Sequence, residues 1–237
     1  MRLLSKTFSC LLCGQATSLE SIICNHCTGL LPANKTPCTR CGLPVDGQPE
    51  TFLDTISDIV CEDCFTHPPL YMSCISPFLY QFPIDQLIST MKLHHQPQLA
   101  KLLAKLMINR MGDNTILPQA LIPIPMHPKN QRSRGYNQAI YLARQLGKHY
   151  KIPVISNALI KTRQTVSQKY LSAAERKQNL SSAFRVNPKL ADTLSRLEHL
   201  AIVDDVITTG ATIEAATACL KTLDIELIDI WAVARTP

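Results

Sequence analysis

The chain has 237 residues, of which 46% are hydrophobic, and this is enough to bury a sizeable core and to exclude a wholly disordered protein. Its net charge of +6 is unevenly spread, because residues 1–75 sum to −3, residues 76–190 to +14 and residues 191–237 to −5. No stretch approaches the eighteen apolar residues of a transmembrane helix, and the first residues lack the apolar run of a secretory signal, so we expect a cytoplasmic protein without membrane insertion.

The N-terminal third is dominated by cysteine. Eight of the ten cysteines form four C-x-x-C pairs, where chance would give about 0.4 such pairs. The pairs are Cys10/Cys13, Cys24/Cys27, Cys38/Cys41 and Cys61/Cys64. Thiols stay reduced in the cytoplasm, so this spacing predicts metal ligands rather than disulfides. The two remaining cysteines, Cys74 and Cys219, have no partner at this spacing, and Cys219 is expected in the core.

The four pairs contain an internal repeat. The first and third are each followed by glycine, Gly14 and Gly42, and glycine tolerates the positive φ that a turn around a metal favours. We therefore expect two units in residues 1–75, each with four thiolates closing a structural zinc site. Sequential pairing is preferred, with the first four cysteines on one ion and the last four on the other, and an interleaved pairing stays open. His26 is expected to face solvent.

From residue 76 onward, helical and strand patterns alternate. Apolar residues recur at helical spacing over 84–91 and 99–107, and Lys101 and Lys105 lie on the polar face of the second helix. The further predicted elements are a strand at 120–124, a helix at 136–150, weak strand fragments at 154–155 and 159–160, a strand at 199–203, a helix at 213–223 and a strand at 227–233. This order predicts that residues 76–237 form an α/β domain with a mainly parallel sheet.

The segment after the 199–203 strand carries the clearest chemistry. Two carboxylates, Asp204 and Asp205, precede a run of small and hydroxyl residues that opens a helix and offers free backbone N–H groups to an anion. The run comprises Thr208, Thr209, Gly210, Ala211 and Thr212. Carboxylates suit ribose hydroxyls and amides suit a 5′-phosphate, and the segment resembles the phosphoribosyl pyrophosphate signature of type I phosphoribosyltransferases. A Walker phosphate loop is excluded, since its motif is absent.

A wider resemblance covers nearly the whole chain. The matching residues are Pro123–Pro128, Arg134–Gln138, Arg163–Thr165, Gln168, Leu171, Glu175-Arg176, Asn179-Leu180 and Ala183-Phe184. In these residues the chain resembles the ComF family. Members of that family combine a cysteine-rich ribbon with a phosphoribosyltransferase-like domain and are associated with competence for DNA uptake. One departure is visible in Met91–His95, where Leu93 and His95 replace the aromatic residue and the glycine of the family's Lys-aromatic-x-Gly turn.

The resemblance assigns roles to the basic loops. The loop from Pro125 to Arg134 would meet the pyrophosphate, and the loop from Lys161 to Arg176 would close over the site. The candidate cations are Arg134, Arg163, Lys169 and Arg176. Asp204, Asp205 and Arg134 are the candidate catalytic residues.

Two functions follow from these patterns. The first is a magnesium-dependent transferase that displaces pyrophosphate from phosphoribosyl pyrophosphate with a nitrogen nucleophile. The second is a non-catalytic competence factor or sensor that contacts single-stranded DNA and competence-machinery proteins, for which the basic middle and the zinc ribbons are suited. Aromatic residues for base stacking are sparse in the basic middle, being mainly Tyr136, Tyr141, Tyr150, Tyr170 and Phe184.

Overall fold

The fold is seen in a computed structural model that describes residues 8–17, 22–46, 59–93, 96, 98–111, 116–127, 131–132, 134–162 and 183–237. Among these residues, no helix is both long and apolar enough to cross a bilayer.

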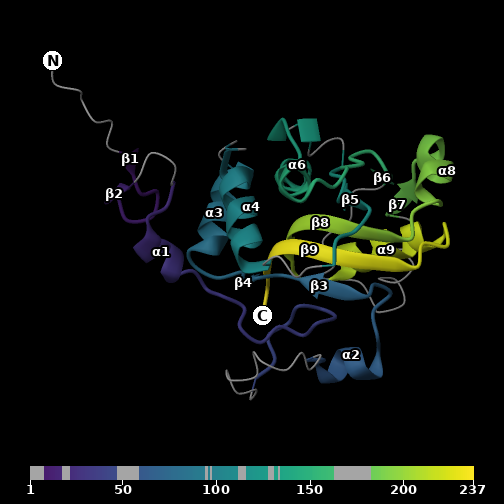
Figure 1. Ribbon diagram of the computed structural model, residues 1–237, viewed down its shortest axis with the longest axis horizontal. Helices are drawn as coiled ribbons and strands as arrows, with labels where there is room; N and C mark the ends of the chain where they lie inside the picture. The colour runs from purple at the N-terminus through teal and green to yellow at the C-terminus, as the bar shows by residue number, and fades with distance from the viewer. Residues whose placement is uncertain are drawn as a thin grey trace.

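A parallel sheet forms the centre of the molecule (Figure 1). Its strand order is β3-β9-β8-β5, and β4 pairs with the far end of β9. The strands are β3 (Ser73–Ile75), β4 (Phe78–Leu79), β5 (Ala120–Pro123), β8 (His199–Ile207) and β9 (Leu227–Arg235). Every pairing in this sheet is parallel. The predicted α/β class with a mainly parallel sheet is therefore confirmed.

Helices cover both faces of the sheet. Helices α3 (Ile84–Leu93), α4 (Gln98–Met111) and α6 (Gln138–Tyr150) pack on one face, and α9 (Ala211–Lys221) packs on the other. Side chains alternate along β8, so Ala201 and Val203 join the first core and Leu200 and Ile202 join the second. Burial on both faces explains the unbroken apolar run of this strand.

Two strand boundaries differ from those expected from the sequence. Strand β8 does not end at residue 203, because its pairing with β9 continues to the Ile207–Arg235 pair. Asp204 and Asp205 therefore lie within the strand rather than in the loop after it. For the same reason β9 continues through Arg235.

The fragment at 159–160 is a strand, but it lies outside the central sheet. It forms β6 (Leu159–Lys161), which pairs antiparallel with β7 (Phe184–Val186). A 3-10 turn (Pro188–Leu190) and α8 (Ala191–Leu194) then lead into β8. The fragment at 154–155 contributes a single parallel bridge, from Val154 to Leu121 of β5.

The N-terminal part forms two small units (Figure 1). The first contains β1 (Phe8–Ser9), β2 (Ala16–Thr17) and α1 (Asn25–Gly29), and the second ends in α2 (Glu62–Thr66). The first unit packs its buried side chains into the core formed with α3 and α4. The second lies at the edge of the sheet, where the Cys74 N–H donates to the Thr39 carbonyl at 2.9 Å. Strand β3 belongs to the sheet because it pairs with β9, although it precedes the predicted domain boundary after residue 75. That boundary stays a prediction.

Candidate functional site

The cysteines gather into two tetrads in sequential order. Within each, the four Sγ atoms lie within 4.8 Å of one another. The tetrads are Cys10, Cys13, Cys24 and Cys27, and Cys38, Cys41, Cys61 and Cys64. Tetrahedral zinc with Zn–S bonds of about 2.3 Å places its sulfurs roughly 3.8 Å apart. The Cys13–Cys24 and Cys41–Cys61 Sγ distances are 3.8 Å and 3.7 Å, so both tetrads fit structural zinc.

The two glycine knuckles are near copies of each other. Gly14 and Gly42 both have φ of +72°, the left-handed conformation expected from the sequence. The Gly14 N–H donates to the Cys10 carbonyl at 2.9 Å, and the Gly42 N–H donates to the Cys38 carbonyl at 2.8 Å. The repeat in the sequence is thus a repeat in backbone structure.

One thiol in each tetrad accepts a backbone hydrogen bond that favours its thiolate form. The Cys24 N–H donates to Cys10 Sγ, and the Cys61 N–H donates to Cys38 Sγ, both at 3.4 Å. Burial acts to raise these pKa values, but the backbone N–H groups outweigh it and lower the pKa of Cys10 to about 6 and of Cys38 to about 7. The thiolate is the form that binds zinc, so the backbone favours metal binding at both sites.

At the carboxyl end of β8, Asp205 is held by a polar network on the α6 face of the sheet. Its side chain is 4% exposed and forms an ion pair with Lys92 of α3. Gln138 of α6 donates from Nε2 to Asp205 Oδ1 at 3.2 Å, and Arg134 donates to Gln138 Oε1 at 2.9 Å. Lys92 thus contacts the buried carboxylate directly, and Arg134 is linked to it through Gln138.

The start of α6 fixes this network in place. Asn137 caps the helix by accepting from the Ala139 N–H, and its Nδ2 donates to the Ile124 carbonyl beyond β5, both at 2.9 Å. The Tyr136 hydroxyl donates to the Met91 carbonyl in α3, beside Lys92. The Arg-Gly-Tyr-Asn-Gln motif is thus a connector between β5, α3 and the strand carboxylates.

Asp204 lies beside Asp205 in the strand, and its Oδ1 accepts the Asp205 N–H at 2.8 Å. Burial, together with the negative charge of Asp205, raises the pKa of Asp204 well above its usual value, although Lys92 partly opposes the shift. Burial also lowers the pKa of Lys161 in β6, and the charge of Asp204 opposes this shift. The Lys161 ammonium lies 5.5 Å from the ring centroid of Phe184.

The turn after β8 has the features of an anion cradle. Thr208 and Thr209 are exposed, and Gly210 has φ of +80° with nothing within 4 Å of the position that a Cβ would take. Gly210 is the N-cap of α9 and has no side chain, and Thr209 Oγ1 accepts a hydrogen bond from the first helical amide, that of Ala211, at 3.4 Å. The first turn of α9 offers its remaining amides to an anion, a ligand that helix N-termini favour.

The structure brings together only part of the set expected from the sequence. Arg134 lies in the carboxylate network, whereas Arg163, Lys169 and Arg176 lie outside the described residues. Lys92 belongs to the network but was not among the expected site residues. The sequence could have indicated Lys92 as a site residue, since it is the lysine of the turn that resembles the Lys-aromatic-x-Gly motif of the ComF family.

Two of the aromatic residues considered for base stacking are not available for it. Tyr136 is 8% exposed and Phe184 is 6% exposed, since both pack in the core. Their burial follows from the docking of α6 and β7, which sequence periodicity alone did not resolve.

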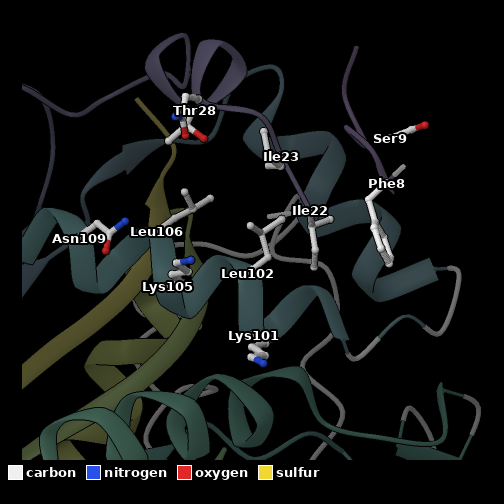
Figure 2. A pocket seen from close by; sticks show the side chains of 11 residues that line it. Phe8, Ser9, Ile22, Ile23, Thr28, Lys101, Leu102, Lys105, Leu106 and Asn109 are labelled. Carbon is white, nitrogen blue, oxygen red and sulfur yellow. The ribbon is translucent and has the colours of Figure 1, made fainter. Parts of the chain in front are cut away.

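A separate groove lies between the first zinc unit and α4 (Figure 2). Its volume is about 760 Å³. Lys101, Lys105 and Asn109 line it from α4, and Phe8 and Ile22 face them from the zinc unit. The groove combines two ammonium groups with an apolar wall, and its lining includes no carboxylate from the part of the chain that the structure describes.

The fold and the sites together define a class of protein: a double zinc ribbon joined to a parallel α/β domain with an acidic strand end and a glycine-containing turn before a helix. The family model of the double zinc ribbon domain matches residues 3–65. Competence protein F of Haemophilus influenzae is 32% identical over 223 residues, which cover 90% of this chain and 96% of that protein. The DNA utilization protein YhgH of Shigella flexneri is 30% identical over 219 residues, 90% of each chain. The chain belongs to the ComF family.

Proposed function

We propose that the carboxyl end of β8 and the turn after it bind phosphoribosyl pyrophosphate. The observation that carries the proposal is the juxtaposition of Asp204 and Asp205 with the Thr208–Thr212 turn, which leads into the N-terminus of α9. Carboxylates accept hydrogen bonds from vicinal ribose hydroxyls, and backbone amides bind the 5′-phosphate. No Cβ stands at Gly210, so a phosphate group can approach the backbone closely there.

The two carboxylates would contribute unequally. Asp205 is engaged by Lys92 and Gln138, so its main task would be to fix the geometry of the strand end. Asp204 would then be the principal partner of the ribose. Arg134 would supply positive charge on the pyrophosphate side, as would Arg163, Lys169 and Arg176 if the second basic loop closes over the ligand.

Magnesium would enter with the ligand. Mg²⁺ keeps several waters and binds substrate phosphates with one or two carboxylates, and Asp204 offers such a donor. Bound there, it would neutralise charge on the departing pyrophosphate.

The reaction this site would support is phosphoribosyl transfer. A nitrogen nucleophile would form a bond to the anomeric carbon while the carbon–oxygen bond to pyrophosphate breaks, and pyrophosphate would leave with the electron pair. Lys92, Gln138 and Arg134 would hold the strand carboxylate in position through this change. Catalysis of this kind relies on positioning and electrostatic stabilisation more than on a strong base.

Calorimetric titration of phosphoribosyl pyrophosphate with magnesium tests this proposal. Wild type is expected to bind, and Asp204→Asn is expected to bind at least about 10-fold more weakly, since a hydrogen bond to a charged group is lost. Asp192→Asn is the matched control, because Asp192 is an exposed carboxylate on α8. Equal binding by wild type and Asp204→Asn would remove the site assignment. Binding without turnover of any nucleobase or amine would favour a sensor over a transferase.

A second candidate function is contact with single-stranded DNA during competence and DNA utilization. The groove between α4 and the first zinc unit favours it, because Lys101 and Lys105 can meet successive phosphates while Phe8 and Ile22 offer an apolar surface to bases. The relatives named for competence and for DNA utilization point the same way. We place this contact at the groove rather than at the strand carboxylates.

The salt dependence of single-stranded DNA binding tests the groove. Each phosphate contact contributes about −0.7 to the slope of log K against log salt, so Lys101→Met/Lys105→Met should reduce the slope by roughly 1.4. Lys148→Met/Lys189→Met removes the same charge from exposed positions elsewhere and should leave the slope nearly unchanged. Equal slopes for both double variants would exclude the groove as the DNA site.

A further inference from the structure

Arg235 connects the second zinc unit to the anion-binding turn. It is the last residue of β9, pairs in register with Ile207 of β8, and is 6% exposed. A buried guanidinium must have its donors satisfied, so the contacts of this side chain indicate its role.

Its donors reach in two directions. Nε donates to the carbonyl of Cys41, a ligand of the second zinc tetrad, at 3.1 Å. Nη1 lies within hydrogen-bonding distance of the carbonyls of Ile207 (3.1 Å), Thr236 (2.9 Å) and Thr208. One side chain thus joins a zinc knuckle to the first two peptide groups of the turn.

These contacts set the direction of the turn's amides. In a trans peptide the C=O and N–H groups point in opposite directions. Because the Ile207 and Thr208 carbonyls point toward Arg235, the N–H groups of Thr208 and Thr209 point away from it. Both residues are exposed, so we expect these donors to be within reach of an anion.

The knuckle that anchors Arg235 is itself fixed to the sheet edge. Asn34 Nδ2 donates to the Gly42 carbonyl at 2.8 Å and to the Ser76 carbonyl at 3.1 Å. A Cβ on Gly42 would lie 2.3 Å from Ser76 Oγ and 3.0 Å from Cys74 Sγ, so the knuckle packs without a gap. Movement of the knuckle would therefore be felt at the Cys41 carbonyl and at Arg235.

We propose that Arg235 is a positioning residue through which the second zinc site sets the conformation of the Thr208–Thr212 turn and its affinity for a phosphorylated ligand. The first zinc site has a different role, since it packs against α4 through apolar side chains. The statement about affinity rests on the proposed function. The statement about conformation does not.

Arg235→Lys tests the link. Lysine keeps the charge, but a single ammonium cannot reproduce the fork that reaches the Cys41 carbonyl and the turn together. The readout is amide exchange at Glu214, whose N–H donates to the Gly210 carbonyl at 2.9 Å, in full-length zinc-loaded protein. Exchange at Glu214 should rise roughly 10-fold or more. Exchange at Ile124, which donates to the Val203 carbonyl in the sheet, should not change.

Two zinc-ligand variants provide the second test, in case Arg235→Lys fails to fold. Cys13 and Cys41 occupy equivalent positions in the two repeats, so Cys13→Ser and Cys41→Ser form a matched pair. Each should lose one zinc equivalent by metal analysis. Only Cys41→Ser should speed exchange at Glu214. Equal exchange in both variants, or no change in either, would overturn the proposal.

Titration of the same proteins with phosphoribosyl pyrophosphate and magnesium separates the two proposals. If both hold, Cys41→Ser and Arg235→Lys weaken binding roughly 10-fold or more and Cys13→Ser does not. If wild type does not bind, the proposed function fails, and the exchange data still decide whether the second zinc site controls the turn. Weakened binding with unchanged exchange at Glu214 would refute the conformational mechanism.

Discussion

Replacing Lys92 with methionine removes the cation that pairs with Asp205 and keeps most of the volume of the side chain. The carboxylate would stay 96% buried, with Gln138 as its remaining donor among the contacts described for it. Breaking a fully buried ion pair by removing one partner typically costs about 3–5 kcal/mol, because the other charge is left uncompensated. The Lys92 side chain is 26% exposed, so solvent screens part of the interaction. We expect Lys92→Met to lower the free energy of unfolding by about 2–3 kcal/mol.

Equilibrium urea unfolding at a fixed zinc concentration measures this change. Lys148→Met removes an exposed lysine from α6 and should change the free energy of unfolding by less than about 0.5 kcal/mol. Adding Asp205→Asn to Lys92→Met removes the stranded charge, so the double variant should be more stable than the sum of the two single changes predicts, by at least about 1 kcal/mol. Additive effects, or a loss no larger than that of Lys148→Met, would refute the reasoning that Lys92 neutralises Asp205.

Three further predictions follow from single sites. The raised pKa of Asp204 means that ionising it in the folded chain is unfavourable, so the stability that it contributes at low pH is lost as pH rises through that pKa. Phosphoribosyl pyrophosphate should bind more weakly as pH falls through the same value, and Asp204→Asn should reduce both pH dependences, measured by urea unfolding and calorimetry, relative to wild type. Gly42→Ala should destabilise the protein by about 1–3 kcal/mol more than Gly14→Ala, because both glycines have φ of +72° but only Gly42 would place a Cβ against Ser76. Equal losses of stability in thermal unfolding would contradict this packing. Chelation of zinc should leave the emission of the single tryptophan, Trp231, unshifted, since it is fully buried between β9 and α6, and a red shift would show that the sheet needs the metal.

Local patterns determined the zinc sites and the elements of the sheet domain. The C-x-x-C spacing and the glycine after alternate pairs act within a single turn of backbone, so Gly14 and Gly42 could be assigned positive φ from the sequence. The apolar run before Asp204 and the small residues after it also act locally, and they predict a buried strand followed by a helix N-terminus.

Contacts between distant segments could not be obtained in this way. The Asp205 partner Lys92 comes from α3, and its position depends on how three helices pack on one face of the sheet. The length of β8 depends on its pairing with β9, which places Asp204 and Asp205 within the strand rather than in the loop after it. Arg235 reaches Cys41 across 194 residues of sequence. The sequence alone therefore determined which groups carry the chemistry, because spacing within a turn is a property of the local chain. Tertiary structure decided which of those groups meet, because that depends on strand register and on packing between segments that no local pattern encodes.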